Sequence, residues 1–538
     1  MVAEASRPWR TLRLTDDRAQ LRILLLALLA GCGSPETGTK TDTAAADTPP
    51  TDSKADTAET GDTSPDSEES GGDTQTAETG GDTGGDSATD TDTGAVTDTD
   101  PGPSGGDFAP ETSASDALAR IISDKAGTDL GRIVKVGDAD GDGQLDVVTT
   151  TLLDDGRTGG GYVLPGPLTT SGAAEALGLH LTGAVRNSGT GRSLSLGDVD
   201  GDGYADIGLG APYDSENNGV YLAFGPTTGD VSLGDPSVAL LRGPRATYAG
   251  HGSDLSGDLN DDGIDDAVVG AYYTSSEKGL TFVVFGPVHD GLDLETDADV
   301  RLEGEAATVY AGRSVRAGAD LDGDGVGDLV IACLGTMGLP ASGGFYVVYS
   351  PLAGDIDLAD ADGRYAGDSY SGAAGLWLDA ADLDGDGLAD IVAAGLDSTL
   401  ATSAGVAYVV LGPASADTNL AGADLVVRGD VAGSYGGGVA MGDLDGDGTA
   451  ELLLGVQGDA TAGVAAGAVY LFSDPSPGSY VFSDGDAAFT GEGPGDSLGT
   501  GMAVGDVDGD GIAEIVMGAP YQDDGGTGAG AFYVMHSL

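Results

Sequence analysis

Seven short segments of the chain carry acidic side chains at alternate positions, a spacing suited to binding a metal ion. Each begins Asp-x-Asp-x-Asp-Gly, with asparagine at the third position of the third copy, and each ends with an acid at its ninth position. Alternate oxygens in a tight turn can converge on one point, and Ca²⁺ accepts six to eight of them. The candidate ligands are the side chains of positions one, three, five and nine and the backbone carbonyl of position seven: Asp138, Asp140, Asp142, Gln144 and Asp146; Asp198, Asp200, Asp202, Tyr204 and Asp206; Asp258, Asn260, Asp262, Ile264 and Asp266; Asp320, Asp322, Asp324, Val326 and Asp328; Asp382, Asp384, Asp386, Leu388 and Asp390; Asp443, Asp445, Asp447, Thr449 and Glu451; Asp506, Asp508, Asp510, Ile512 and Glu514.

This set of ligands favours calcium over magnesium, because Mg²⁺ needs a stricter octahedron and keeps several bound waters. Glycine occupies the sixth position of every copy, where the chain must turn sharply. Crowded carboxylates repel one another without a cation, so bound metal stabilises the folded form. We expect up to seven Ca²⁺ ions, one in each repeat, and no other cofactor.

Two other interpretations of the loops compete with this one. An EF-hand loop begins in the same way, but it needs an acid at position twelve and a helix on each side. The residues at position twelve exclude an EF-hand, since they are Thr149, Leu209, Val269, Ile331, Ala393, Leu454 and Met517. Solvated acidic turns without metal stay open as an alternative, because Asp and Gly also favour turns. Turn formation alone, however, does not require oxygen-bearing side chains at the same four positions in each of seven copies.

The loops belong to a repeated unit, because successive copies begin 60, 60, 62, 62, 61 and 63 residues apart. Such a period marks a solenoid, an array or a propeller. Each loop lies between two strand-like segments; a third strand follows, as at 221–224 and 282–285, and a weaker fourth comes after Gly-Pro or Ser-Pro. Four strands repeated radially form a propeller blade. The prediction is an all-β, seven-bladed β-propeller with four-stranded blades.

The order of the strands also predicts how the ring closes. The seventh copy ends after its third strand, at 532–535, whereas an unmatched strand-like segment at 118–122 precedes the first loop. We expect this segment to supply the missing fourth strand of the seventh blade. Closure of this kind leaves no long sheet edge open to pairing with another chain.

The motifs around the loops resemble the FG-GAP repeats of the integrin alpha-chain propeller, from about residue 115 to the end of the sequence. Gly-Ala-Pro stands at 210–212 and 518–520 and becomes Gly-Ala-Tyr at 270–272. The Phe-Gly element keeps only its glycine at 130–131, 435–436 and 498–499, and copies one, four, five and six lack a clear Gly-Ala-Pro. The resemblance implies a non-enzymatic surface module that binds a protein or glycan ligand.

The first residues have the organisation of a bacterial lipoprotein signal peptide. Five arginines within residues 1–22 precede an apolar run at 23–30, which is shorter than the roughly 20 residues of a transmembrane helix. The ending Leu29-Ala30-Gly31-Cys32 resembles the lipobox, which implies cleavage before Cys32 and acylation of that residue. We expect a signal peptide at 1–31 and a lipid anchor at Cys32, in the bacterial cell envelope at the outer membrane or cell surface. An ordinary signal peptide with an incidental cysteine is the alternative.

Residues 33–106 consist almost entirely of Thr, Asp, Gly, Ser, Ala, Glu and Pro. With 18 acidic side chains against two lysines and no aromatic residue, this segment repels itself and has nothing to bury. The composition predicts that residues 32–106 form a lipidated, disordered linker, and that the folded domain comprises residues 107–538.

The remaining residues offer little catalytic chemistry. A net charge of −67 argues against nucleic-acid binding. Cys333 lies in a strand-like run and is expected to be buried, without a disulfide to Cys32. None of the four histidines has a recognisable catalytic spacing, so no catalytic residue is assigned and an enzyme is the less favoured class. Four aromatic residues either line a face or pack between blades: Tyr248, Tyr310, Tyr370 and Trp377.

Together these patterns predict a calcium-stabilised, lipid-anchored binding or adhesion module of the cell surface, acting as a monomer. Two alternatives stay open. The chain is an extracellular polysaccharide-active enzyme on a propeller scaffold if acids and aromatic residues meet in one central cleft, or it is a purely structural surface protein.

Overall fold

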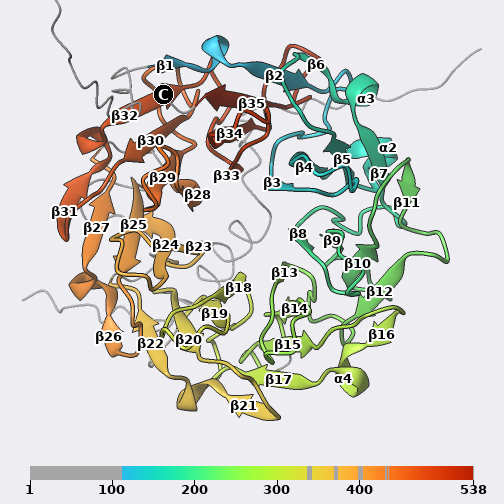
Figure 1. Ribbon diagram of the computed structural model, residues 1–538, viewed down its shortest axis with the longest axis vertical. Helices are drawn as coiled ribbons and strands as arrows, with labels where there is room; N and C mark the ends of the chain where they lie inside the picture. The colour runs from blue at the N-terminus through green and yellow to red at the C-terminus, as the bar shows by residue number, and fades with distance from the viewer. Residues whose placement is uncertain are drawn as a thin grey trace, which may run out of the picture. The chain divides into compact units, whose positions relative to one another are not determined.

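Seven β-sheets arranged around a central axis make up the folded domain (Figure 1). The computed structural model describes residues 112–536 except 275, 336–341, 369–372, 398–403, 431–432 and 434–435. The expected signal peptide, Cys32 and the acidic linker lie outside the described residues. Within them, the sheets confirm the prediction of an all-β, seven-bladed propeller.

Each blade runs outward from the axis through strands of alternating direction. The innermost strands are β3 (Val134–Gly137), β8 (Leu194–Gly197), β13 (Gly252–Gly257), β18 (Val315–Ala319), β23 (Trp377–Ala381), β28 (Gly436–Gly442) and β33 (Met502–Gly505). The second strands are β4 (Asp146–Thr151), β9 (Asp206–Gly210), β14 (Asp266–Ala271), β19 (Asp328–Cys333), β24 (Asp390–Asp397), β29 (Glu451–Val456) and β34 (Glu514–Ala519).

Two further strands complete the predicted set of four in each blade. The third strands are β5 (Gly160–Leu164), β10 (Gly219–Ala223), β15 (Leu280–Val284), β20 (Gly344–Val348), β25 (Ala404–Val410), β30 (Ala468–Phe472) and β35 (Ala531–His536). The fourth strands are β7 (Leu179–Thr182), β12 (Ala239–Arg242), β17 (Val300–Glu303), β22 (Gly363–Ala366), β27 (Leu425–Arg428), β32 (Ala487–Thr490) and, for the seventh blade, β2 (Ala119–Ile122).

The prediction of four-stranded blades is wrong, because every sheet has a fifth, outermost strand. This strand comes from the neighbouring blade and pairs in parallel with the fourth strand, as Leu292 of β16 does with Leu241 of β12. The fifth strands have only two to four residues, too few for a readable alternation, and their partners lie far away in sequence. They are β11 (Val231–Ser232), β16 (Leu292–Asp293), β21 (Asp355–Asp357), β26 (Asp417–Asn419), β31 (Gly478–Val481), β1 (Thr112–Ser113) and β6 (Gly172–Ala173).

Short helical turns follow six of the seven fifth strands and mark the rim of the domain (Figure 1). They are η1 (Ala114–Asp116), α3 (Ala174–Leu177), α4 (Leu294–Asp297), η2 (Leu358–Asp360), η3 (Leu420–Gly422) and η4 (Phe482–Asp484); another turn, α2 (Asp154–Arg157), follows β4. No helix among the described residues is long and apolar enough to cross a membrane.

The ring closes as the strand order predicts. Strand β2, from the start of the described chain, pairs antiparallel with β35 near its end, and Ile121 lies opposite Phe532. The adjacent β1 pairs with β32 of the sixth blade. The segment with β1 and β2 therefore adds a strand to both the sixth and the seventh blade, whose other strands come from the C-terminal part of the chain.

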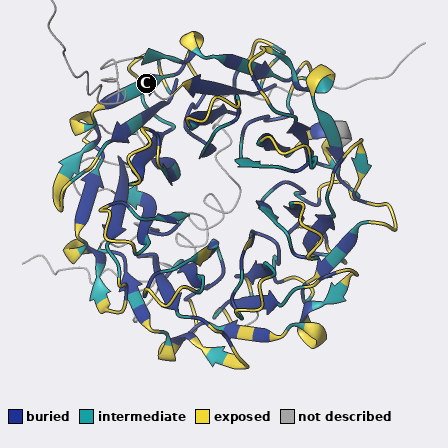
Figure 2. Ribbon diagram, in the orientation of Figure 1, coloured by how far each residue is buried: buried dark blue, intermediate teal, exposed yellow. Residues whose placement is uncertain are grey.

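The core lies between neighbouring blades, and the second and third strands of the blades are the most buried (Figure 2). Third strands place an aromatic ring in these interfaces: Tyr346 is fully buried there, and Tyr408 is 1% exposed. Trp377 is partly buried against the core between the fifth and sixth blades. Cys333 is buried, as expected.

Two glycines explain why the repeat motifs keep this residue even where the phenylalanine is lost. Gly131, of the first Phe-Gly element, lies against Gly518, of the last Gly-Ala-Pro element. A Cβ atom on Gly518 would lie 1.7 Å from the carbonyl oxygen of Gly131, which adopts a φ of +84°. Any side chain at these positions would therefore push neighbouring blades apart.

Candidate metal centres

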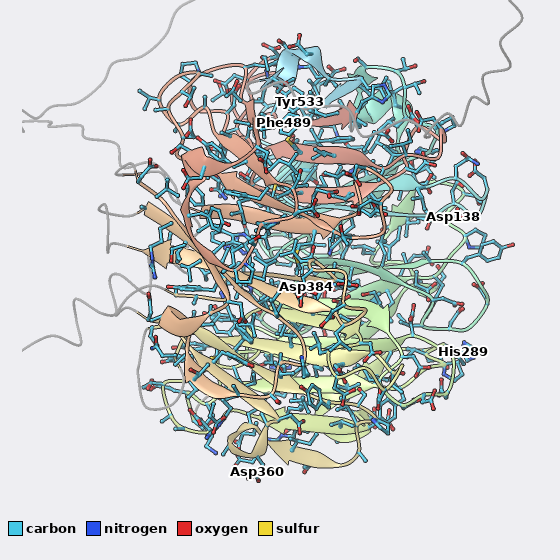
Figure 3. All side chains as sticks on the ribbon, turned by 60° about the vertical axis from the view of Figure 1, so that its left-hand side comes forward. Asp138, His289, Asp360, Asp384, Phe489 and Tyr533 are labelled. Carbon is cyan, nitrogen blue, oxygen red and sulfur yellow. The ribbon has the colours of Figure 1, made fainter. Side chains whose placement is uncertain are left out.

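The seven acidic loops lie between the first and second strands of their blades, at one end of the sheets. Their ninth residue begins the second strand in every case and is buried, whereas positions one, three and five are half-buried or exposed. The turn between the third and fourth strands lies at the same end, because strand direction alternates. Figure 3 labels Asp138 of the first loop and His289 of such a turn at the same edge.

The first aspartate of each loop shapes the turn. One of its carboxylate oxygens accepts a hydrogen bond from the N–H of the sixth-position glycine in all seven copies, at 2.7–3.0 Å. These glycines have φ between +87° and +97°, which confirms the sharp turn predicted at position six. In the same way, the fifth side chain accepts from the N–H of position seven at 2.8–3.0 Å.

The ninth acid joins three parts of a blade. In the first loop, Asp146 Oδ2 accepts from the N–H of Ala139, at position two, and Asp146 Oδ1 accepts from the N–H of Gly166, in the turn after the third strand, both at 2.9 Å. The same pair of bonds recurs in the next four copies, at Asp206, Asp266, Asp328 and Asp390. In the first loop Asp146 Oδ2 also accepts from the N–H of Asp140 at 3.0 Å, whereas an oxygen that accepts one such bond, as Asp146 Oδ1 does from Gly166, keeps a second lone pair for a cation.

The structure brings the predicted carboxylates together in groups. Side-chain oxygens of positions one, three and nine lie within 4.8 Å of one another in the first, second and fifth loops, and those of positions one, three and five do so in the fourth. In the third loop, Oδ1 of Asn260 is buried and accepts no hydrogen bond from any described residue. Such an oxygen is an available ligand, so the donor set fits a hard divalent cation.

Burial makes the ninth acids costly to ionise without a cation. Burial is the main cause of their raised pKa. The neighbouring acids raise the pKa further, whereas the backbone hydrogen bonds lower it. The pKa of Asp206, Asp266 and Glu451 rises to about 7, that of Asp328 and Asp390 to about 6, and those of Asp146 and Glu514 also rise. A bound cation favours the charged form of these groups.

Position seven has a second role that the sequence does not reveal. Its side chain lies against the fourth-position glycine of the preceding loop, so that a Cβ atom on Gly141 would meet Tyr204 at 2.7 Å. The same neighbours occur at Gly201 and Ile264, Gly323 and Leu388, Gly385 and Thr449, and Gly509 and Gln144. Neighbouring acidic loops therefore contact one another at five of the seven blade boundaries.

The seventh loop contains a residue that sequence reasoning missed. His536, one of the four histidines without a recognisable catalytic spacing, belongs to a group with Asp508, Asp510 and Glu514. Its Nδ1 lies 3.5 Å from Glu514 Oε1 and 3.9 Å from Asp508 Oδ2. The only signal in the sequence is that His536 ends the third strand of its blade, opposite the ninth acid in the register of β34 and β35.

A row of tyrosines lies at the other end of the sheets, in the connections after the second strands and before the first strands. Tyr248 is stacked on Tyr273 at 5.0 Å between ring centroids, and Tyr273 on Tyr310 at 6.2 Å. Tyr213 meets Tyr248 edge to face at 5.5 Å. Tyr213 and Tyr273 are 37% and 39% exposed. The sequence left open whether Tyr248 and Tyr310 line a face or pack between blades; in this row Tyr248 is half-buried and Tyr310 is buried. Tyr370 lies outside the described residues.

Comparison with known proteins points in one direction. The FG-GAP repeat model matches residues 190–222 and 498–535. Integrin alpha-7 of Rattus norvegicus is 33% identical over 162 residues, and integrin alpha-IIb of Homo sapiens is 32% identical over 225 residues. These alignments cover 29% and 38% of this chain, and the chain spans only 13% and 20% of the two relatives.

Among solved structures, the Dos1 propeller aligns with a TM-score of 0.39 and 9% identity, covering 72% of this chain and 74% of that one. The seven sheets described above make this chain a seven-bladed β-propeller, and the FG-GAP matches and the partial similarity to integrin alpha chains support an integrin-like propeller.

Proposed function

We propose that the chain is a calcium-stabilised, lipid-anchored adhesion module that binds a protein or glycan ligand at the bacterial cell surface. The observation that carries this proposal is the set of seven acidic loops at one end of an integrin-alpha-like propeller. In each loop, the side chains of positions one, three, five and nine would hold Ca²⁺ with the carbonyl of position seven. The ion would neutralise the repulsion between these groups.

The other end of the propeller is the better candidate for the ligand. Its tyrosine row exposes Tyr213 and Tyr273, and Arg192 and Arg313 lie over tyrosine rings, 5.9 Å from Tyr213 and 5.7 Å from Tyr272. Tyrosine and arginine are the residue types enriched where partners bind. The carboxylates at the opposite end are engaged with their own loops.

A binding experiment tests this assignment. Beads coated with the full chain are expected to adhere to the cells that produce it, and the double variant Tyr213→Ala/Tyr273→Ala is expected to reduce adhesion at least about tenfold. Tyr204→Ala is the matched control, since Tyr204 is 39% exposed among the acidic loops. If the control lost adhesion and the double variant kept it, the ligand would bind at the end of the acidic loops, and the assignment to the tyrosine row would be contradicted.

The lipid anchor needs its own experiment, because Cys32 lies outside the described residues. Acylation of this residue with two or three chains gives stable membrane attachment, whereas one chain alone is marginal. Cys32→Ser is expected to move the protein from the membrane fraction to the soluble fraction. Retention of the variant in the membrane fraction would contradict the anchor.

A further inference from the structure

Among the described residues, no turn amide donates to the ninth acid of the seventh loop, whereas one does so in five of the other loops. In those copies, the ninth acid has a second oxygen that accepts from an amide in the turn after the third strand. Glu514 makes only the other contact, through Oε2, with the N–H groups of Val507 at 3.0 Å and Asp508 at 3.3 Å. Its Oε1 is buried, and no described residue donates a hydrogen bond to it.

An imidazole stands beside this orphaned oxygen. The register of β34 and β35 places His536 directly opposite Glu514, and Nδ1 lies 3.5 Å from Oε1. In the other six blades, the residue that directly follows the last paired residue of the third strand holds this place opposite the ninth acid. None of these residues is a histidine: they are Pro165, Phe224, Phe285, Tyr349, Leu411 and Ser473. The sheet register thus gives this loop alone a nitrogen ligand.

The distances suit a shared ion better than a direct bond. A hydrogen bond between these atoms would need about 2.7–2.9 Å. The ligands of a tetrahedral zinc ion, with bonds of about 2.0–2.1 Å, lie roughly 3.3–3.4 Å apart. His536 Nδ1 is 3.5 Å from Glu514 Oε1 and 3.9 Å from Asp508 Oδ2, and an oxygen of Asp510 completes a group of four within 4.8 Å.

The type of ligand distinguishes the metal. Calcium takes oxygen ligands, whereas imidazole suits zinc and its neighbours in the first transition series. We propose that His536, Glu514, Asp508 and Asp510 form a site for a divalent ion of the zinc class, distinct from the calcium loops of the other six blades. The proposal rests on the proposed function only in that the acidic loops bind cations.

Cobalt is the appropriate probe, because Co²⁺ takes zinc sites and its visible absorption reports nitrogen and oxygen ligands. The purified full chain is stripped with chelator, returned to about 1 mM Ca²⁺ to fill the oxygen-only loops, and titrated with Co²⁺ and then Zn²⁺. We expect one Co²⁺ per chain with a four-coordinate spectrum, displaced by one equivalent of Zn²⁺.

The variants decide which residue is responsible. His536→Gln removes the nitrogen but keeps an oxygen for calcium, and it is expected to weaken cobalt binding at least about tenfold. His289→Gln is the control, because His289 is an exposed histidine near the second acidic loop but outside its group of three acids. A wild-type chain without the cobalt band, or a band unchanged by His536→Gln, would overturn this inference. Failure of the calcium proposal would instead appear as a chain that binds no Ca²⁺ at all.

Discussion

The N–H of Leu168 donates a 2.7 Å hydrogen bond to the carbonyl of Val507 and so joins the turn after β5 in the first blade to the acidic loop of the seventh. Equivalent bonds link Thr227 to Ala139, Val288 to Val199 and Leu352 to Leu259. The acidic loops are therefore part of the contact between blades as well as of the blades themselves. A cation that fixes a loop would stabilise the adjoining interface.

Chelation is expected to lower the melting temperature by about 10 °C or more. At a calcium concentration ten times the dissociation constant, each site adds about 1.4 kcal/mol, and the calcium sites together add several times that. Differential scanning calorimetry with and without EDTA measures the change, and re-addition of Ca²⁺ should reverse it. Identical melts would contradict calcium binding in the loops.

One loop can be tested by an isosteric change. Asp384 Oδ1 accepts from the N–H of Asp386 at 3.2 Å, a bond that asparagine can keep. Asp384→Asn, which reproduces the donor set of the third loop with its Asn260, should therefore weaken calcium binding in this loop without abolishing it and reduce calcium-dependent stabilisation by about 1 kcal/mol, with little effect in EDTA. The control is Asp360→Asn, an exposed acid on η2 remote from the loops (Figure 3). An equal effect of the control would show a general charge effect instead.

Ring closure predicts that two truncations behave differently. Removal of residues 1–106 leaves β1 and β2 in place, whereas removal of residues 1–123 deletes both and exposes the edge of β35 with its buried Phe532 and Val534. The longer truncation is expected to melt at least about 10 °C lower and to self-associate through the open edge. Sedimentation and thermal melts compare the two; equal behaviour would mean that β2 does not hold the ring.

An arginine near the axis links three blades. Arg316 of β18 lies 3.4 Å from Asp254 of β13 through Nη1 and 3.1 Å from Asp379 of β23 through Nε. Arg316→Leu leaves two acids without their partner and is expected to cost about 3–5 kcal/mol of unfolding free energy. Arg242→Leu, which removes an exposed pair with Asp293, should cost at most about 1 kcal/mol. Equal losses in denaturant unfolding would refute the distinction.

The same group gives a pH dependence of defined sign. Burial alone would raise the pKa of Asp254, but the charges of Arg316 and Lys135 and the surrounding hydrogen bonds outweigh it and hold the pKa below its usual value. The ionised group therefore stabilises the fold fully above the unfolded pKa of about 3.9, and this stabilisation is lost as the pH falls through the folded value. In EDTA, the stability difference between wild type and Asp254→Asn should be constant above about pH 5 and shrink on acidification. A difference that grows in acid would show a raised pKa.

The blade count, the loop positions and the closing strand follow from the sequence, because each leaves a local mark. The acidic loops recur at a near-constant period, and the unmatched segment at 118–122 stands where a fourth strand is missing. A two-residue parallel strand such as β16 leaves no such mark, since its partner β12 lies one blade away. The expectation of four strands failed for this reason.

What the sequence determines by itself is the chemistry of the loops, because alternating acids and a glycine with positive φ are set within nine consecutive residues. Only the tertiary structure decides what each loop touches. It turns the ninth acid toward the turn after the third strand, places Tyr204 against Gly141 of the neighbouring loop, and brings His536 to Glu514. These contacts depend on sheet register and on the packing of one blade against the next, which no stretch of local sequence records.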